Sequence, residues 1–541
     1  MRYSVKGNYV DVFERTAFPA EVFIVDGRIE KILGRDDFFE DFILPGIVDS
    51  HVHIESSMLI PQEFARLAVT HGTVASVSDP HEIANVLGLR GVDFMIDDGK
   101  RVPFKFYFGA PSCVPATAFE SSGFELNSAD VESLLQRDEI KYLSEMMNFP
   151  GVVYGDKEVA LKLAAAKKAS KPIDGHAPGL KGESLMKYAA GGITTDHESV
   201  CENEAIDKIK LGIKLQIREG SAAKNFEALW PVLIKYPDDV MLCTDDCHPD
   251  DLIEKHILQL VKRAVDEGVD FFDAFRSATV NPVEHYKLDV GLLRVGDKAD
   301  FIIVNNLQEL NVLETYIDGE CVYSENRSLI ETKSIDLINN FNRTSLSIDD
   351  ILIKDIGKNI QVIVAKDGDL YTAKEIVKPK VDEGSLVSDV ENDVLKIVVV
   401  NRYNNSKPVV GFIKNFGLKK GAIAGSVAHD SHNIIAVGVC DVDILNAINK
   451  VVEHKGAIVA LNGDEILDLA LPIAGLMSNE NAEIVADKYK KLNAKAKEWG
   501  STLHAPFMTL SFMALLVIPE LKIGDKYLFD GLKFSETSLF V

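Results

Sequence analysis

Short β-rich runs alternate regularly with helix-length segments from Ile43 onward. Such alternation is typical of repeated βα units around a parallel sheet. Eight strand-like runs end by residue 244, and eight parallel strands close a (β/α)8 barrel, usually within ~250 residues. Polar or ionisable residues follow almost every run, where such barrels place their working side chains. The sequence therefore predicts an α/β fold built on a TIM-like barrel. The expected strands are Ile43–Asp49, Thr73–Ser78, Lys105–Gly109, Ile140–Met147, Pro172–Gly175, Ile193–Asp196, Lys214–Ile217 and Val240–Thr244.

The 541 residues exceed the length of one barrel, and further parts flank it. Residues 1–44 and 291–345 contain short strand patterns with turns, and we expect them to pair into one small β-sandwich domain beside the barrel segment 45–290. Residues 346–541 combine strand-like runs with a Lys-rich helical segment at Glu483–Trp499, which predicts a C-terminal α+β domain. The expected barrel helices include Pro61–His71, Asp156–Ser170 and Asp250–Glu267.

Charge and cysteine content narrow the choice of partners. With 58 Lys and Arg against 83 Asp and Glu, the net charge is −25, which repels phosphate backbones and anionic membranes, so we expect no nucleic-acid or membrane partner. The six cysteines have no regular spacing, which favours reduced thiols. The N-terminal segment is polar, and the longest apolar run, Phe507–Pro519, is shorter than the ~20 residues that span a bilayer. We expect a soluble cytoplasmic homo-oligomer, taken as a dimer, that acts on a small molecule.

The first predicted strand runs into the pair His51-Val-His53. Because residues i and i+2 of a strand point to the same side, the two imidazoles can bind one cation. A lone His-x-His pair is a weak signal, since two core or surface histidines give the same pattern. Four imidazoles and two carboxylates at one rim, however, suffice for two divalent ions that activate water. The further ionisable residues at later strand ends are Glu145, His176, His197 and Asp245.

Longer motifs around these residues carry a family resemblance. The segment Pro45-Gly-Ile-Val-Asp-Ser-His-Val-His-Ile-Glu-Ser-Ser-Met58 resembles the first-strand signature of the amidohydrolase superfamily, in the version of the adenine deaminase family. Further segments similar to that family follow in the same order over most of the chain, including the C-terminal domain. They are Ser78-Asp-Pro-His-Glu82, Glu145-Met-Met-Asn-Phe-Pro-Gly151, Asp174-Gly-His-Ala-Pro-Gly179, Ile217-Arg-Glu-Gly-Ser221, Leu242-Cys-Thr-Asp-Asp246 and Ala428-His-Asp-Ser-His-Asn433.

The resemblance implies a role for each candidate ligand. Many relatives bridge their two ions with a carboxylated lysine, and Lys141 and Lys157 are the alternatives here. They rank below Glu145, because the match of the segment that begins at Glu145 favours the glutamate. Of the paired aspartates, Asp245 fits the pattern of the superfamily and Asp246 is expected outside the ligand set. The implied ligands are His51, His53 and Asp245 for one ion, His176 and His197 for the other, and Glu145 as the bridge.

The implied reaction is the hydrolytic deamination of adenine to hypoxanthine and ammonia in purine salvage. The resemblance implies two divalent ions per subunit, Mn²⁺ or Fe²⁺ with Zn²⁺ as an alternative. The catalytic residues would be Asp245, which takes the proton of the attacking water toward the departing amine, and Glu145. A proton donor near purine N1 is also required, and three acidic or imidazole side chains are candidates for it, namely Glu55, His81 and Glu82.

Other side chains are candidates for contact with the purine. Arg218 and Ser221 could hold the purine edge, although an ion pair is an equal explanation for Arg218. The stretch with His429 and His432 is expected to be a turn with surface imidazoles, and the alternative is that the C-terminal domain lends them to the barrel mouth. The expected substrate contacts are Glu55, Asp79, His81, Glu82, Arg218 and Ser221.

Two further functions remain open from the sequence. A cyclic-amide hydrolase of the dihydroorotase or hydantoinase kind would use the same metal pair, although the C-terminal domain counts against it. A barrel that has lost activity and serves as a binding or scaffold protein would have lost ligands, whereas every ligand type is present here.

Overall fold

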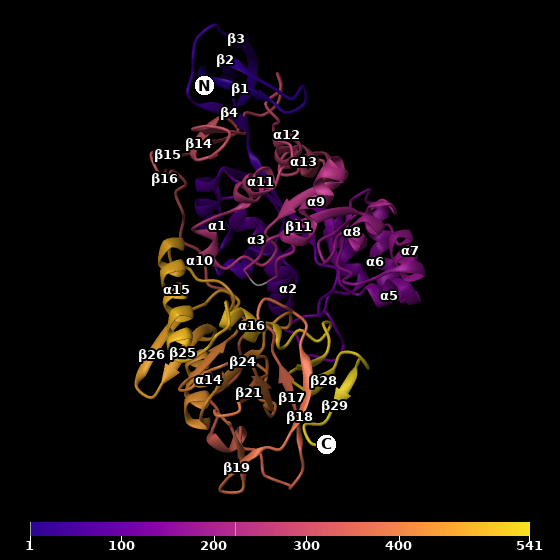
Figure 1. The fold of residues 1–541 in the computed structure, drawn as a ribbon, viewed down its shortest axis with the longest axis vertical. Helices are drawn as coiled ribbons and strands as arrows, with labels where there is room; N and C mark the ends of the chain where they lie inside the picture. Colours follow the sequence, from indigo (N-terminus) through magenta and orange to yellow (C-terminus); the bar gives the residue numbers. More distant parts are fainter. Residues whose placement is uncertain (1, 222) are drawn as a thin grey trace.

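The computed structural model describes residues 2–221 and 223–541. Three parts follow one another along its long axis: a small sheet that holds the N-terminus, the barrel, and the C-terminal module (Figure 1). Within the described residues, no helix combines the length and the apolar character needed to cross a membrane.

Eight parallel strands form the barrel in two hydrogen-bonded sheets, β5 to β9 and β10 to β12. Backbone bonds join these sheets at both seams: Thr194 N donates to Ile173 O (2.8 Å), and Asp245 N donates to His51 O (2.9 Å). The predicted eight-stranded barrel is therefore confirmed. Its strands are β5 (Ile47–Val52), β6 (Thr73–Ser78), β7 (Lys105–Ala110), β8 (Ile140–Met146), β9 (Ile173–Gly175), β10 (Thr195–Asp196), β11 (Lys214–Arg218) and β12 (Val240–Cys243).

The first predicted strand differs from the observed one, because it divides at Gly46 into β4 (Phe42–Pro45) and β5. A Cβ at Gly46 would lie 2.5 Å from the Val74 side chain, so only glycine lets the chain pass this close to β6. This division places β4 in the small sheet and β5 in the barrel.

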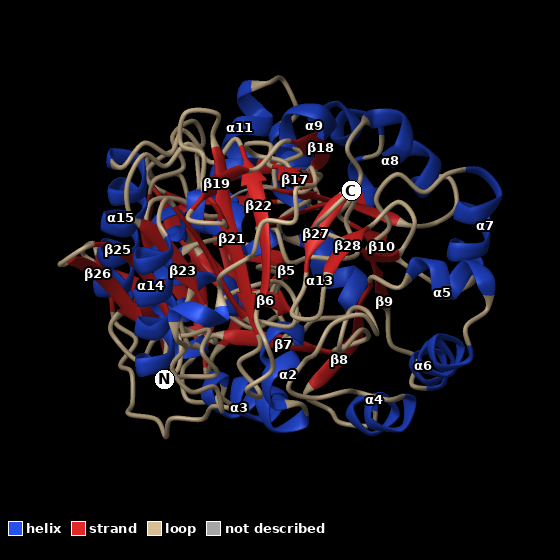
Figure 2. Ribbon diagram, turned by 90° about the horizontal axis from the view of Figure 1, so that it is seen from below, coloured by secondary structure: helices blue, strands red, loops and turns tan. Residues whose placement is uncertain are grey.

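Helices cover the outside of the barrel (Figures 1 and 2). The predicted helix Asp250–Glu267 is wrong in one respect, because the chain leaves the helix before His256. The His256 side chain turns into the core, where its Nδ1 lies 2.6 Å from Thr73 Oγ1. The helices are α1 (Pro61–Ala68), α2 (His81–Leu87), α3 (Leu89–Gly99), α4 (Ser128–Leu135), α5 (Phe149–Tyr154), α6 (Lys157–Lys168), α7 (Gly182–Ala190), α8 (Glu202–Ile209), α9 (Phe226–Lys235), α10 (Pro249–Leu252), α11 (Ile257–Asp266), α12 (Phe271–Arg276) and α13 (Val280–Tyr286).

The two segments that flank the barrel pair in one eight-stranded sheet of order β16-β15-β14-β13-β4-β1-β2-β3. Strand β4 joins the halves, since it pairs with β1 on one side and β13 on the other. The other strands are β1 (Arg2–Asp11), β2 (Thr16–Val25), β3 (Arg28–Gly34), β13 (Phe301–Val304), β14 (Val312–Ile317), β15 (Glu320–Ser324) and β16 (Arg327–Ser328).

The C-terminal module is built on a second eight-stranded sheet, of order β18-β17-β22-β21-β24-β23-β25-β26. Helix α14 packs on β23 to β25, α15 reaches the barrel helices α1 and α10, and α16 packs against β23 and β24. The module lies below the barrel mouth (Figure 1). Its elements are β17 (Ile360–Val364), β18 (Ala373–Val377), β19 (Lys380–Asp382), β20 (Ser385–Val387), β21 (Val394–Val400), β22 (Val409–Lys414), β23 (Ala422–Gly425), β24 (Ile434–Gly438), α14 (Asp441–His454), β25 (Ala457–Asn462), β26 (Glu465–Ala470), α15 (Ala482–Glu498), α16 (Pro506–Phe512), β27 (Leu521–Ile523), β28 (Leu528–Asp530) and β29 (Ser535–Thr537).

Candidate metal centre and substrate pocket

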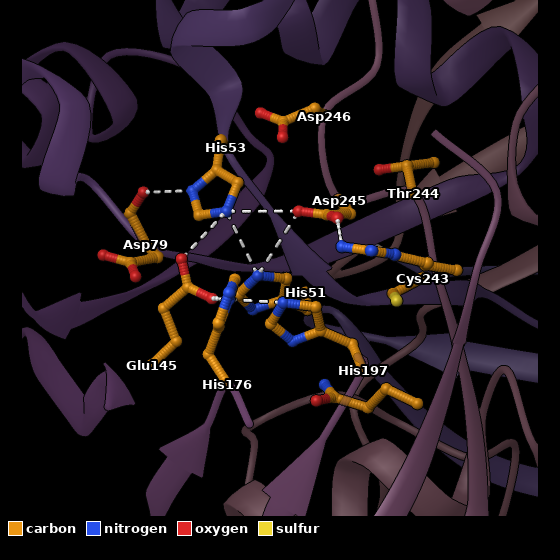
Figure 3. Close-up of polar contacts among 12 residues, drawn as sticks. His51, His53, Asp79, Glu145, His176, His197, Cys243, Thr244, Asp245 and Asp246 are labelled. Atoms are coloured by element: carbon orange, nitrogen blue, oxygen red, sulfur yellow. Dashed lines mark hydrogen bonds and ion pairs between the residues drawn. The ribbon is translucent and has the colours of Figure 1, made fainter. Parts of the chain in front are cut away.

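The C-terminal ends of the barrel strands bring the six expected ligands into one buried group (Figure 3). Alternation along β5 turns His51 into the barrel, and His53 follows on the same side just past the end of that strand. The other four stand at the ends of β8, β9, β10 and β12. None is more than 7% exposed. The four are Glu145, His176, His197 and Asp245.

One half of the group consists of His51, His53 and Asp245. Their ligand atoms lie within 4.8 Å of one another. His53 Nε2 is 3.2 Å from His51 Nε2 and 3.2 Å from Asp245 Oδ1. This half offers two imidazole nitrogens and one carboxylate oxygen to a common point.

Glu145 lies between this half and the remaining histidines. Its Oε1 is 3.5 Å from His53 Nε2, while its Oε2 is 2.8 Å from His176 Nδ1 and 3.1 Å from His197 Nε2. A carboxylate with one oxygen toward each group has the placement of a bridging ligand.

The six side chains have the chemistry of ligands for a pair of divalent cations, and hydrogen bonds among themselves do not satisfy them all. The facing Nε2 atoms of His51 and His53 can share only one proton, and a cation between such atoms satisfies both. The nitrogens that face the centre are His51 Nε2, His53 Nε2, His176 Nδ1 and His197 Nε2. Imidazole and carboxylate are common ligands of divalent transition metals. The group therefore has the composition of a divalent metal centre.

Arg218, from the end of β11, fixes the outer side of this centre. Its guanidinium donates to Asp245 Oδ2 (2.6 Å) and to both oxygens of Glu198 (2.5 and 2.9 Å). Burial alone would raise the pKa of Asp245, but Arg218 and His53 hold it well below its usual range. Asp245 is thus kept ionised, as ligation or proton acceptance requires. Arg218 thus forms the ion pair that was the alternative to purine binding for this residue.

The residues expected outside the ligand set lie elsewhere. Lys141 stands at the opposite end of β8 from Glu145, and Lys157 is exposed at the start of α6. Asp246 accepts a hydrogen bond from Ser56 (2.5 Å) at the pocket wall.

A small, partly open pocket lies beside the centre, with a volume of about 30 Å³, room for roughly one or two water molecules. Its barrel side includes His81, Glu82 and Arg218 among the expected substrate contacts, together with five of the six expected ligands, all but His51. Its opposite side comes from the C-terminal module: Leu370, His429, Asp430, Phe512 and Leu515. A purine is larger than this volume, so its entry would require the pocket to widen.

The other three expected contacts do not line the pocket. Glu55 accepts a hydrogen bond from Ile83 N (3.1 Å), and burial followed by repulsion from Glu82 raises its pKa to about 8. Asp79 accepts from the backbone N–H and from Nδ1 of His81 (both 3.1 Å), so it orients that imidazole. Ser221 turns away and donates to Asp251 Oδ2 (2.5 Å).

The expectation of surface imidazoles in the segment between β23 and β24 is wrong. His429 is 2% exposed and His432 is fully buried. His429 Nδ1 lies 3.3 Å from Glu82 Oε1, so the module does reach the barrel mouth. The polar sequence alone predicts a surface turn, because the barrel residues that bury this segment are more than 300 positions away in sequence.

Sequence reasoning missed several pocket residues. Glu198 could have been identified from the sequence, because it directly follows His197 at a strand end. Asp430 lies between His429 and Ser431 in a segment similar to the family, but nothing in its sequence context distinguishes it from a surface aspartate. Leu370, Phe512 and Leu515 line the pocket. The sequence could not identify them, because it does not distinguish apolar pocket residues from apolar residues of the module core.

Comparison with known proteins agrees with this arrangement. Residues 42–322 match the model of the amidohydrolase family, and residues 369–535 match the model of the adenine deaminase C-terminal domain. The adenine deaminase of Methanosarcina acetivorans is 54% identical over 99% of both chains. Those of Sulfurovum sp. and Borreliella burgdorferi are 54% and 47% identical, each over 98% of both chains. By its barrel, its C-terminal domain and its full-length similarity, the chain belongs to the adenine deaminases of the amidohydrolase family.

Proposed function

We propose that the chain hydrolyses the amino group from C6 of adenine, giving hypoxanthine and ammonia, as a step of purine salvage. The placement of Glu145 between His53 on one side and His176 and His197 on the other carries this proposal. That arrangement suits a pair of ions beside a buried pocket, and family membership supplies the class of reaction.

The six donors would hold two divalent ions, and we propose Mn²⁺ or Fe²⁺, with Zn²⁺ also compatible with imidazole and carboxylate ligands. Bound ions of this kind supply Lewis-acid activation of the attacking water near neutral pH. All other roles fall to the side chains of this protein.

Asp245 has the position for proton transfer. Arg218 holds its Oδ2, which leaves Oδ1 directed at His53 and at the centre. At Oδ1 the carboxylate would accept the proton of the attacking water and pass it to the departing amine. Positioned acid–base groups of this kind contribute about 10²- to 10⁴-fold in rate.

Attack at C6 requires a proton at N1, and two of the three candidates stand in the pocket wall. His81 is oriented by Asp79, and Glu82 accepts from Ser56 (3.0 Å). We assign proton donation to this pair and a supporting position to Glu55. The apolar side chains Phe512 and Leu515 would exclude bulk water from the reacting atoms.

The test is ammonia release from adenine by metal-loaded protein, with dihydroorotate and a hydantoin as comparison substrates. The proposal expects turnover of adenine and none of the cyclic amides. Turnover of a cyclic amide without turnover of adenine would establish the alternative hydrolase. Metal content near zero in protein purified without chelators would favour a scaffold.

A cytoplasmic location completes the proposal. All six cysteines lie within the described part of the chain and are free thiols, the usual state in a reducing compartment. Fractionation of cells of the source, followed by the adenine assay, tests this.

A further inference from the structure

A second, larger cavity lies beside the pocket at the metal centre. Its volume is about 1180 Å³, above the roughly 300–1,000 Å³ that is usual for a small-molecule site. Barrel loops that follow β7 and β8 form one side of it, the C-terminal module forms the other, and it is partly open to solvent. We call this space the outer cavity. Its lining includes Thr117, Ala118, Phe119, Glu120, Asn148 and Phe149 of the barrel.

The outer cavity and the pocket are close neighbours. Met147, just past the end of β8, lines both of them. In the module, Leu370 lines the pocket while the next residue, Tyr371, lines the outer cavity. Leu515 and Val517 divide in the same way. These module segments therefore separate the two spaces, and we call them the partition. The partition consists of residues 370–371 and 512–517.

The apolar side chains of the partition pack apart from the main core. Leu370, Phe512 and Leu515 belong to a small cluster that also includes Ala223 of the barrel, whereas the barrel interior forms a separate cluster. A unit packed in this way can shift without opening the core of either domain.

Lys522, on β27, holds the two halves of the partition to each other. It is fully buried, and its Nζ donates to Leu370 O (2.8 Å) and to Phe512 O (2.9 Å). Burial lowers its pKa to about 7. The neutral amine has two N–H groups, which equals the number of carbonyls that it meets. Thr372 Oγ1 adds a bond to Leu521 O (2.8 Å), next to Lys522.

The outer cavity has the chemistry to accept a planar nitrogen heterocycle. Phe119, Phe149 and Tyr371 contribute aromatic rings to its lining, and planar bases stack on such rings. Burial raises the pKa of Glu120 to about 8, so this carboxyl group is largely uncharged near neutral pH and can both donate and accept a hydrogen bond. Aromatic rings beside an uncharged carboxyl group suit an uncharged purine base.

A purine also needs space that the pocket does not have. The barrel side of the pocket consists largely of proposed metal ligands and their neighbours at strand ends, which are fixed by the barrel. The partition is the part of the wall that packs in a cluster of its own. Displacement of the partition would widen the pocket toward the outer cavity, because that cavity lies on its other side.

We propose that a purine base reaches and leaves the metal centre through the outer cavity, that it passes by displacing the partition, and that Lys522 is the positioning residue that favours the closed partition. The inference rests on the proposed function for the identity of the base. It concerns the route of the base and leaves the roles at the metal centre unchanged.

The experiment blocks the outer cavity reversibly in the metal-loaded full chain. Ala118 is exposed and lines the outer cavity but not the pocket. Ala118→Cys would be modified with a methanethiosulfonate that attaches a benzyl group, and kcat/KM for adenine measured before and after. The attached group should lower kcat/KM at least about tenfold by slowing entry. Two metal equivalents should remain, and a phosphine reductant should restore kcat/KM.

Two controls accompany this measurement. Wild-type protein treated in the same way accounts for the exposed thiols of Cys201 and Cys440. Ala129→Cys places a thiol at an exposed position of α4 outside the cavity lining. Both should keep kcat/KM. An unchanged kcat/KM in modified Ala118→Cys, or an equal loss in modified Ala129→Cys, would overturn the inference, whereas a wild type that does not deaminate adenine would show the proposed function itself to be wrong.

Lys522→Met tests the positioning role. Loss of two hydrogen bonds should make the closed partition less favourable, so KM for adenine should rise about tenfold while kcat changes less. Lys533→Met, at an exposed position of the turn after β28, should keep the wild-type KM. A purely structural role would reduce the amount of active protein, which lowers kcat at an unaltered KM, and that result would overturn the role given to Lys522.

Discussion

Replacing Glu145 by glutamine is the most direct test of the metal centre. The two side chains have nearly the same shape, but glutamine has no charge and offers one acceptor oxygen in place of two. In the structure, Oε2 meets His176 and His197, while Oε1 faces His53. The amide oxygen of glutamine can face the ligand nitrogens on one side only. The amide NH₂ then faces the ligand nitrogens on the other side, where it cannot bind a cation.

The size of the effect follows from what Glu145 contacts. Mutation of groups that only orient metal ligands costs 10- to 100-fold in metal affinity. A direct ligand shared by both ions should cost at least about 100-fold for each ion, or about 2.7 kcal/mol. We therefore expect Glu145→Gln to retain fewer than two metal equivalents after gel filtration and to lose adenine turnover in parallel.

Elemental analysis and ammonia release on the same preparation provide the measurement. Glu139→Gln is the matched control, because Glu139 precedes the same strand at its far end and pairs with Lys100 near the surface. Full metal content and full activity in Glu145→Gln would refute the bridging role of Glu145. Lys141 and Lys157 would then be the remaining candidates for the bridging ligand.

Three further predictions concern other parts of the site. Asp245→Asn should keep much of the metal, because His51 and His53 remain, while kcat falls about 10²- to 10⁴-fold; metal analysis and initial rates measure this, and unchanged kcat would remove Asp245 from proton transfer. Phe512→Ala should lower stability by about 3–5 kcal/mol and raise KM for adenine, because it removes a buried ring from the pocket wall and from the stack with His429; an unaltered KM would argue against this wall. Burial lowers the pKa of Lys522 from 10.5 to about 7, so the unfolded chain binds more protons between about pH 7 and 10 and stability rises with pH across that window, by up to about 1.4 kcal/mol per unit. Lys522→Met should flatten the rise of Tm with pH, and parallel Tm profiles for the two proteins would contradict the shifted pKa.

The sequence predicts the barrel and its six inward residues for a physical reason. Strand alternation decides which side chains face inward, and the parallel barrel brings all strand ends to one rim. Both rules act locally, so His51 and His53 could be placed together from their spacing alone. Where a local exception occurs, as at Gly46, only the neighbouring strand shows why, because the constraint is the Val74 side chain.

The substrate pocket could not be predicted in the same way. Its outer wall depends on how the C-terminal module docks, and no periodicity in the sequence encodes that contact. His429 and Asp430 therefore had the pattern of a polar turn, although the barrel buries them. Ser221 shows the opposite case, since it lies in a family motif beside Arg218 and yet donates to Asp251, away from the pocket.

This division also separates the metal centre from part of the pocket lining. The barrel contributes all six side chains proposed as metal ligands, and as ligands they would activate water whichever ring is bound. The module contributes Asp430 and His429 to the lining of the pocket, and neither belongs to the proposed ligand set. Because the two sets come from different domains, we expect substitutions in the segment between β23 and β24 to leave the metal content unchanged. The His81 imidazole is where the sets meet, since it approaches Glu145 with one nitrogen and Asp430 with the other.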